Sequence, residues 1–296
     1  MINNLLYKKA IILFLTFCFI ACLNAQQITS IPHFEQGKIY QINADVQNSM
    51  VQQAMGQSID FKVNAVAAHS YKITNSTDDF TTLHHKMQRI FFQFDGMGTK
   101  RSFDSDNKKD MDGFAGPAIR ELLERKYDMI TDAGGKITLV NPASFPALPQ
   151  DDRTAIIFSM LRDITDLAGP PAKGSNSFFK IFPDTAVQAG SKWTETNQTA
   201  TGKSATLYTL AAITDSTLVV DFVTEATDNI TSQIMGQQAV SKINSTSKGQ
   251  VIIDKASGIV KERNSTTESH GTVEAMNTSM PVTGKTITSI KVSMAE

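Results

Sequence analysis

Apolar and polar residues alternate along much of this sequence, and this alternation is the feature that most limits its fold. A period of two places successive side chains on opposite faces of a strand, so that one face is buried and the other is solvated. Sheets with one solvated face are typically antiparallel. The apolar members of the first two runs are Tyr40, Ile42, Ala44 and Val46, then Ile59, Phe61, Val63 and Ala65. The chain is therefore predicted to consist mainly of half-buried antiparallel strands.

Further strands and turns follow along the chain. A third strand is predicted to begin at Tyr71, and residues 89–95 form another, with Ile90, Phe92 and Phe94 on one face. The Gly-containing stretch 95–98 predicts a hairpin turn, because glycine adopts the positive φ that such turns need. Beyond residue 193 nearly all segments are strand-like, including hairpin 251–261 and a final strand over 286–294.

Two helices interrupt the strands. Pro117 suits a first helical position, and apolar residues at helical spacing extend this helix to about residue 125. A second helix is predicted over 152–167, capped by an aspartate and ended by Gly169-Pro170. Its apolar stripe includes Ile157 and Leu161.

A stretch from Ser177 to Trp193 separates the helical block from the later strands. It contains the only Trp of the chain, three Phe residues, Pro183 and Gly190. We interpret it as the seam of one domain, residues 26–296, built from halves 26–112 and 177–296 around a helical insert at 113–170. The predicted class is α+β: a mostly antiparallel, strongly curved, half-barrel-like sheet with two inserted helices.

The N-terminus has the pattern of an export signal. Lys8 and Lys9 precede an apolar run from Ala10 to Leu23, which is short for a membrane span. We expect residues 1–25 to be a signal peptide cleaved after Ala25, with lipidation at Cys22 as the alternative. The protein is thus predicted to be periplasmic, extracellular or anchored to the outer membrane, with no transmembrane helix in its mature chain.

Composition and missing motifs exclude several classes of function. The two cysteines, Cys18 and Cys22, both fall in the leader, so we expect neither disulfides nor thiol chemistry. The chain has 28 Lys and Arg against 29 Asp and Glu and no basic run, which argues against nucleic acid. The common nucleophile, phosphate-loop, dinucleotide and zinc-protease motifs do not occur in it. We therefore expect no catalytic residue, cofactor or metal.

Two polar groups could still suggest a metal. His69, His84 and His85 have no acidic residue at ligand spacing, and we interpret them as surface or turn histidines. The acidic loop Asp104–Asp112 lacks the ligands that a helix–loop–helix calcium site needs, since Lys108 and Ala115 stand at its fifth and twelfth positions. A looser calcium site at this loop is left open.

The apolar residues suggest either a core or a ligand cavity. Phe outnumbers Tyr and Trp combined, and Met is frequent; both residues form adaptable apolar walls. The residues predicted to line such a cavity, or to belong to the core, are Phe92, Phe94, Ile157, Leu161, Phe182, Trp193 and Phe222.

Three features together resemble β-rich, secreted or lipid-anchored envelope families of Gram-negative bacteria without assigned function. They are the leader, the Phe-rich run with Pro183, Val187, Gly190 and Trp193, and the hairpin Ile253-Asp254 to Gly258-Ile259-Val260. The layout is distantly similar to the lipoprotein-carrier fold, in which a half-barrel wraps helices. That resemblance implies a non-enzymatic envelope protein with a lipid or other hydrophobic ligand between sheet and helices. The alternatives are an interaction module that binds another envelope protein and, third, a hydrolase without recognisable motif.

Overall fold

A single antiparallel sheet dominates the protein. The computed structural model describes residues 27–54, 56–146, 148, 157–199, 201–234, 237–275 and 278–295. The leader and its two processing sites lie outside these residues, so export remains a prediction. The strands are β1 (Ile39–Ala54), β2 (Gln57–Ser76), β3 (Phe80–Gly96), β4 (Thr99–Asp104), β5 (Lys126–Asp132), β6 (Ile137–Asn141), β7 (Lys192–Gln198), β8 (Gly202–Ile213), β9 (Thr217–Ile234), β10 (Gln237–Asp254), β11 (Val260–Ala275) and β12 (Thr278–Met294).

Strands from both ends of the chain meet in the middle of the sheet. The order is β6-β5-β3-β2-β1-β12-β11-β10-β9-β8-β7, and β4 pairs separately with β3. β1 pairs with β12 from Tyr40 opposite Met294 to Gln52 opposite Val282. This pairing joins the early and late strands into one sheet.

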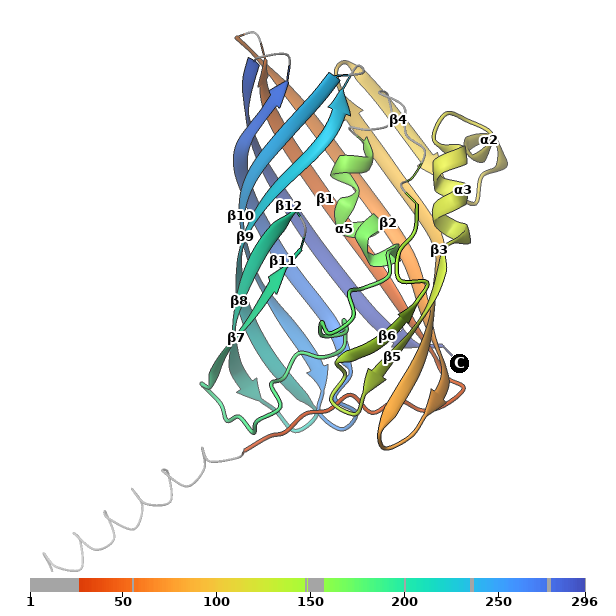
Figure 1. Ribbon diagram of the computed structural model, residues 1–296, viewed down its shortest axis with the longest axis vertical. Coiled ribbons are helices and arrows are strands. Elements are labelled where there is room, and N and C mark those ends of the chain that lie inside the picture. The colour runs from red at the N-terminus through yellow and green to blue at the C-terminus, as the bar shows by residue number, and fades with distance from the viewer. Residues whose placement is uncertain are drawn as a thin grey trace, which may run out of the picture.

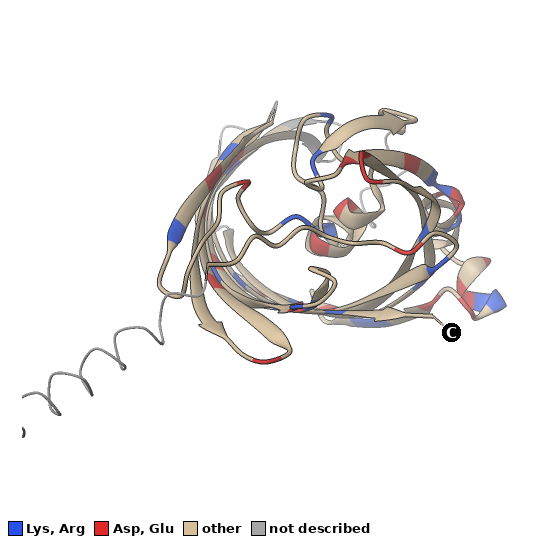
Figure 2. Cartoon of the chain, turned by 90° about the horizontal axis from the view of Figure 1, so that it is seen from below, with Lys and Arg blue, Asp and Glu red and all other residues tan. Residues whose placement is uncertain are grey.

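The sheet curls around an interior but does not close (Figures 1 and 2). β6 and β7 are its two edges. Residues 172–190, here called the connecting segment, run between these edges. At the β6 edge the Ile137 N–H donates to the Ser175 carbonyl at 2.9 Å, and near the other edge the Gly190 N–H donates to the Leu210 carbonyl at 2.8 Å.

The alternation predicted from the sequence is confirmed in the burial of the long strands. Phe61, Val63 and Ala65 are at most 2% exposed, whereas the intervening residues of β2 are exposed. β2 is one continuous strand of 20 residues, so the separate strand predicted from Tyr71 is wrong. The pattern simply continues through Tyr71 and Ile73, which are both buried.

The helices are short and lie at two places. α2 (Lys108–Met111) and α3 (Gly116–Glu124) pack beside β3, and α3 agrees with the helix predicted near 117–125. Residues 157–160 are helical and are followed by α5 (Arg162–Thr165) and the 3-10 turn η1 (Asp166–Ala168) inside the curve of the sheet (Figure 2). A single helix over 152–167 was predicted; residues 152–156 lie outside the described part, and the described part is interrupted at Leu161.

The helical content is smaller than an α+β class implies, because the described chain is mostly antiparallel sheet with a few short helices. The predicted helical insert itself contributes β5 and β6 to the sheet. None of the helices in the described part of the chain is long and apolar enough to cross a membrane.

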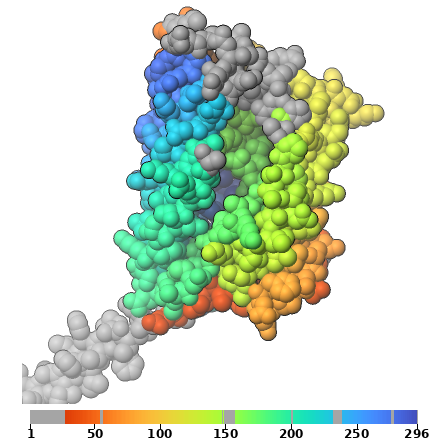
Figure 3. Space-filling model, viewed as in Figure 1, coloured from red at the N-terminus to blue at the C-terminus, as the bar shows by residue number. Residues whose placement is uncertain are grey.

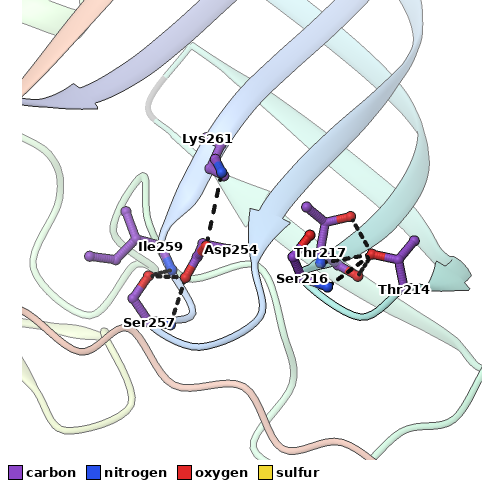
Figure 4. A network of polar contacts seen from close by, with 7 residues as sticks. All are labelled: Thr214, Ser216, Thr217, Asp254, Ser257, Ile259 and Lys261. Atoms are coloured by element: carbon purple, nitrogen blue, oxygen red, sulfur yellow. Dashed lines mark hydrogen bonds and ion pairs between the residues drawn. The ribbon is translucent and has the colours of Figure 1, made fainter.

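Polar turns close the lower end of the later strands (Figure 4). The Asp254 carboxylate accepts hydrogen bonds from the Ser257 N–H and hydroxyl, each at 2.9 Å, in the turn between β10 and β11. In the neighbouring turn, the Thr217 N–H donates to the Thr214 hydroxyl oxygen at 2.8 Å. These contacts agree with the hairpin predicted over 251–261.

Candidate functional site

The residues predicted to line a cavity or to belong to the core lie in two separate buried groups. Phe92, Phe94, Ile157 and Leu161 belong to one buried cluster, between β1–β3 and the helical residues 157–168. Phe182 and Phe222 belong to another, with Trp193 packed against it and only partly buried. The space between sheet and helices is therefore filled by side chains of the first cluster.

Open space lies instead beside the helices, over the concave face of β8–β12. The space-filling view shows a hollow between the β7 side and the helical segment, with the C-terminal strands at its back (Figure 3). One row of residues crosses this face in register and is only half-buried. This row, here called the hydroxyl belt, is Thr206, Thr224, Ser247, Thr267 and Thr286.

Neighbouring hydroxyls of the belt bond to each other in pairs. Thr206 and Thr224 are 2.8 Å apart between their hydroxyl oxygens, and Ser247 and Thr267 are 2.6 Å apart. Each hydroxyl has one donor and two acceptor sites, so a single bond leaves further capacity. The belt can therefore still bond to a polar molecule in the hollow.

The hollow changes character along its length. Above the belt, toward the hairpin ends, an apolar rim is formed by residues of β9–β12. These residues are Ile230, Ile243, Val273, Met280 and Val282. Below the belt, Ile181, Phe182 and Val187 of the connecting segment fill the interior with apolar side chains. A polar zone thus lies between two apolar ones.

A stack of rings forms the floor of the hollow. Trp193 lies between Phe182 and Tyr208, with ring centroids 5.5 Å apart on both sides. Tyr208 contacts Phe222 at 6.2 Å, and the Arg263 guanidinium lies 4.7 Å from the centre of the Phe222 ring. The indole N–H of Trp193 donates to the Ile181 carbonyl at 3.1 Å, which holds the connecting segment to β7.

Gly249 makes room for the end of this stack. A Cβ at this position would meet the Asn264 carbonyl oxygen of β11 and would lie 2.7 Å from the Phe222 ring, which crosses β10 toward Arg263. We expect Gly249→Ala to lower the free energy of unfolding by about 1–3 kcal/mol, because the β11 backbone at Asn264 and the Phe222 ring must both move in a packed interior. Urea denaturation measures this. Gly169→Ala is the control, since its Cβ meets only ordinary contact at 3.4 Å; an equal loss there would contradict the prediction.

Charged side chains also project into the hollow. The Asp163 carboxylate accepts a hydrogen bond from the Thr288 hydroxyl of β12 at 3.3 Å, and Arg162 and Asp166 pair at 3.7 Å. Burial raises the pKa of Asp163 and of Asp166, against the opposing charge of Arg162. Both carboxylates nevertheless remain exposed to solvent inside the hollow, so a ligand there can reach them.

Glu195 stands at the β7 end of the hydroxyl belt, opposite Thr206. Burial raises the pKa of its carboxyl, while a hydrogen bond from Asn176 and the charge of Arg263 act in the other direction. The polar zone thus carries both signs of charge.

Two histidines lie in the core, against the expectation of surface positions. His69 and His85 are 1% and 0% exposed, and the His69 Nδ1 lies 3.2 Å from the His85 Nε2. Both face inward because the alternation of β2 and β3 continues through them. Only His84 faces outward, where it contacts Asp128 at 2.7 Å. The other ring nitrogens of His69 and His85 have no hydrogen-bond partner among the described residues.

The acidic loop at 104–112 is held together by protein contacts. Arg89 bonds to Asp104 at 2.7 Å and to Asp106 at 2.9 Å, and the Asp110 carboxylate accepts the Asp104 N–H at 2.9 Å. Among the described residues no group of three metal-binding side chains occurs. The carboxylates of Asp104 and Asp106 are thus engaged by an arginine, and that of Asp110 by a backbone N–H.

The hydroxyl belt had a signal in the sequence. Ser245 and Ser247, then Ser265, Thr267 and Ser269, alternate with longer polar residues. Such runs contain no apolar face, so a search for hydrophobic periodicity passes over them.

Comparison with known proteins adds a family match over part of the chain. A family model described as "Family of unknown function (DUF6263)" matches residues 172–260. The match begins at the connecting segment and ends at the start of β11, so it includes the ring stack and much of the hollow. No curated protein matches the sequence.

Among solved structures, the chain is similar to a lipovitellin structure titled for its lipid–protein interactions, with 12% identity and a TM-score of 0.49. The matched region covers 88% of this chain but only 26% of the lipovitellin chain. An outer membrane channel from Pseudomonas putida F1 matches with 7% identity, 88% and 97% coverage and a TM-score of 0.28. DynF of the dynemicin pathway of Micromonospora chersina matches with 7% identity, 91% and 85% coverage and a TM-score of 0.21.

Proposed function

We propose that this protein is a non-enzymatic binding protein that holds an amphipathic, lipid-like ligand in the hollow of its sheet. The observation that carries the proposal is the contrast between the two halves of one concave face. Residues 157–168 cover β1–β3, whereas the face of β8–β12 above the connecting segment is left half-exposed. Small hydroxyl side chains there leave space that large apolar residues fill elsewhere.

The order of the three zones supports an amphipathic ligand. The hydroxyl belt and the charges beside it can hydrogen-bond a polar group, which is costly to bury without such partners. The rim above it offers apolar side chains to a hydrocarbon chain, whose burial is favourable in proportion to its area. The sequence had suggested a site between the sheet and the helices. The site proposed here lies beside the helices instead.

Export to the cell envelope is part of the same proposal and is supported by the leader. Lys8, Lys9 and the apolar run that follows have the composition of a signal peptide. N-terminal sequencing of the purified protein distinguishes a chain that begins at Gln26 from one that begins at an acylated Cys22.

Filling the hollow tests the binding function. We expect Ser247→Trp to weaken binding of a lysophospholipid at least about tenfold, because an indole at the centre of the hydroxyl belt occupies the space that the ligand needs. The control is Lys248→Trp, one residue along β10 on the exposed outer face. Mass spectrometry of lipids that co-purify with the native protein gives a second readout. If both variants bind as the wild type does, and no lipid co-purifies, the proposal is wrong.

One observation favours the alternative, an interaction module. The outer face of the sheet has a shallow depression of about 210 Å³, lined by Val66, Phe91 and Arg89 among others. Val66 is 43% exposed, so the depression offers apolar surface to a partner. If Val66→Lys abolishes an association with another envelope protein while lipid binding is absent, this alternative replaces the first.

A further inference from the structure

The charges of the hollow point to a particular kind of polar group. On the assumption that the hollow binds an amphipathic ligand, we propose that the ligand's head group is zwitterionic, with its anionic part on Arg263 and its cationic part on Asp163.

Arg263 is the first half of the observation. Its side chain is half-buried on the concave face and lies over the Phe222 ring. Among the described residues it has neither an ion pair nor a hydrogen bond of its guanidinium; Glu195 is close enough to be influenced by its charge but lies beyond ion-pair distance. A guanidinium has five N–H donors in a planar fork that suits phosphate or carboxylate oxygens. Unused donors in an enclosed space favour an anionic group.

Asp163 is the second half. Its carboxylate points from α5 to β12 and accepts one hydrogen bond, from Thr288. Arg162 influences it electrostatically but pairs with Asp166 instead. The carboxylate therefore has unused acceptor sites and, within the described chain, no ion-pair partner, which favours a cationic group.

The two charges stand close enough for one head group. Arg263 is opposite Ile290 in the register, and Thr288 is two residues further along β12. Strand geometry therefore places the Cα atoms of Arg263 and Thr288 roughly 8 Å apart. The guanidinium of Arg263 extends toward β10 and lies over the Phe222 ring, which stands in the same cross-strand row as Thr288. Ser265, opposite Thr288, adds a hydroxyl to the same area.

A neutral or singly charged head group leaves at least one of the two charged side chains without a partner. An anion alone meets Arg263 but is repelled by Asp163 and by Glu195, which lies near Arg263, while a cation alone leaves Arg263 unpaired. A zwitterion places an anionic group on Arg263 and a cationic group on Asp163, so that both charged side chains gain a partner. Electrostatic complementarity of this kind selects one ligand over others more than it adds affinity.

The test compares four ligands that each carry one oleoyl or oleyl hydrocarbon tail: lysophosphatidylethanolamine, lysophosphatidic acid, oleylamine and mono-olein. Trp193 is the only tryptophan and lies in the floor of the hollow, so its fluorescence reports binding. We expect the wild type to bind the zwitterion at least about tenfold more tightly than mono-olein, since each charge-assisted hydrogen bond adds one to a few kcal/mol.

Two variants assign the charges. The Arg263→Gln variant should bind the zwitterion no more tightly than oleylamine. The Asp163→Asn variant should bind the zwitterion no more tightly than lysophosphatidic acid. Arg101→Gln is the matched control, because Arg101 lies over the Phe114 ring at 4.6 Å in another part of the fold. Thermal unfolding checks that each variant is folded. If one variant does not fold, the affinities of the wild type for the four ligands still test whether a zwitterionic head group is preferred.

The outcomes separate this inference from the proposed function. If the four ligands bind equally well and mass spectrometry finds none of them retained by Ser247→Trp, the head-group inference is wrong and the binding function stands. If variants of Arg263 and Asp163 retain the wild-type preferences, the assignment is also wrong. If no ligand binds at all, the proposed function fails, and this inference fails with it.

Discussion

Leu161→Asp is expected to unfold the whole protein rather than the helical segment alone. Leu161 is fully buried between the helical residues and β1–β3. A carboxylate at this position would have no cation partner, and burying an unpaired charge costs several kcal/mol. We expect the free energy of unfolding to fall by more than about 4 kcal/mol, which is the range of mutations that break a core. Urea denaturation followed by circular dichroism measures it.

The reason for a global effect is that the cluster around Leu161 contains residues of β1, β2 and β3 together with α3. Tryptophan fluorescence reports a distant part of the fold, since Trp193 packs against the cluster of β8–β11. We expect the two probes to give the same transition, as in a single cooperative unit. Leu139→Asp is the control, because Leu139 is 48% exposed. A variant that loses helical signal while Trp193 unfolds as before would contradict the one-domain interpretation.

The strands were predictable because their burial follows a period of two. Residues such as Phe92 and Val63 alternate with polar neighbours, and a half-buried strand is the structure that suits this pattern. The order of the strands was not predictable in the same way. The pairing of β1 with β12 joins residues about 250 positions apart, and no local signal specifies that contact.

The site was predicted less well, because the search was for apolar residues. Phe94 and Ile157 turned out to fill the core, whereas the hollow is lined by Ser247, Thr267 and similar residues. A hydroxyl in a strand is an ordinary surface residue unless the sheet curves and brings it inside. Curvature is a property of the whole sheet, so the sequence of one strand does not reveal it.

The histidine positions were wrong for a related reason. His69 continues the inward series of β2, and His85 that of β3, but histidine is more often exposed than buried. Their rings face each other, so one ring must donate to the other. Whichever ring donates, one buried N–H and one lone pair remain without a partner among the described residues.

This buried pair is expected to make the protein unstable in mild acid. Burial lowers the pKa of His69 to about 4 and, together with the charge of its neighbours, that of His85 to about 3, from 6.5 in the unfolded chain. Between these values the unfolded chain binds protons that the folded protein does not, so stability is present above pH 6.5 and is lost as the pH falls. We expect a loss of about 2–3 kcal/mol per pH unit near pH 5 for the pair.

The double variant His69→Leu, His85→Phe isolates this effect. Phenylalanine retains the ring that stacks on Tyr127 at 4.5 Å, but neither new side chain titrates. The raised pKa values of Asp163, Asp166 and Glu195 act in the opposite direction, because a carboxyl that binds its proton more tightly in the folded state stabilises the fold in acid. The difference between wild type and double variant removes that contribution, and His270→Gln, at an exposed position, serves as control.

If urea denaturation at pH 7 and pH 5 gives the same loss of stability for the wild type and the double variant, then the buried histidines do not control the acid response. Carboxylates whose pKa is lowered by their partners, such as Asp104 beside Arg89 and Asp254 in the turn with Ser257, would then have to account for it.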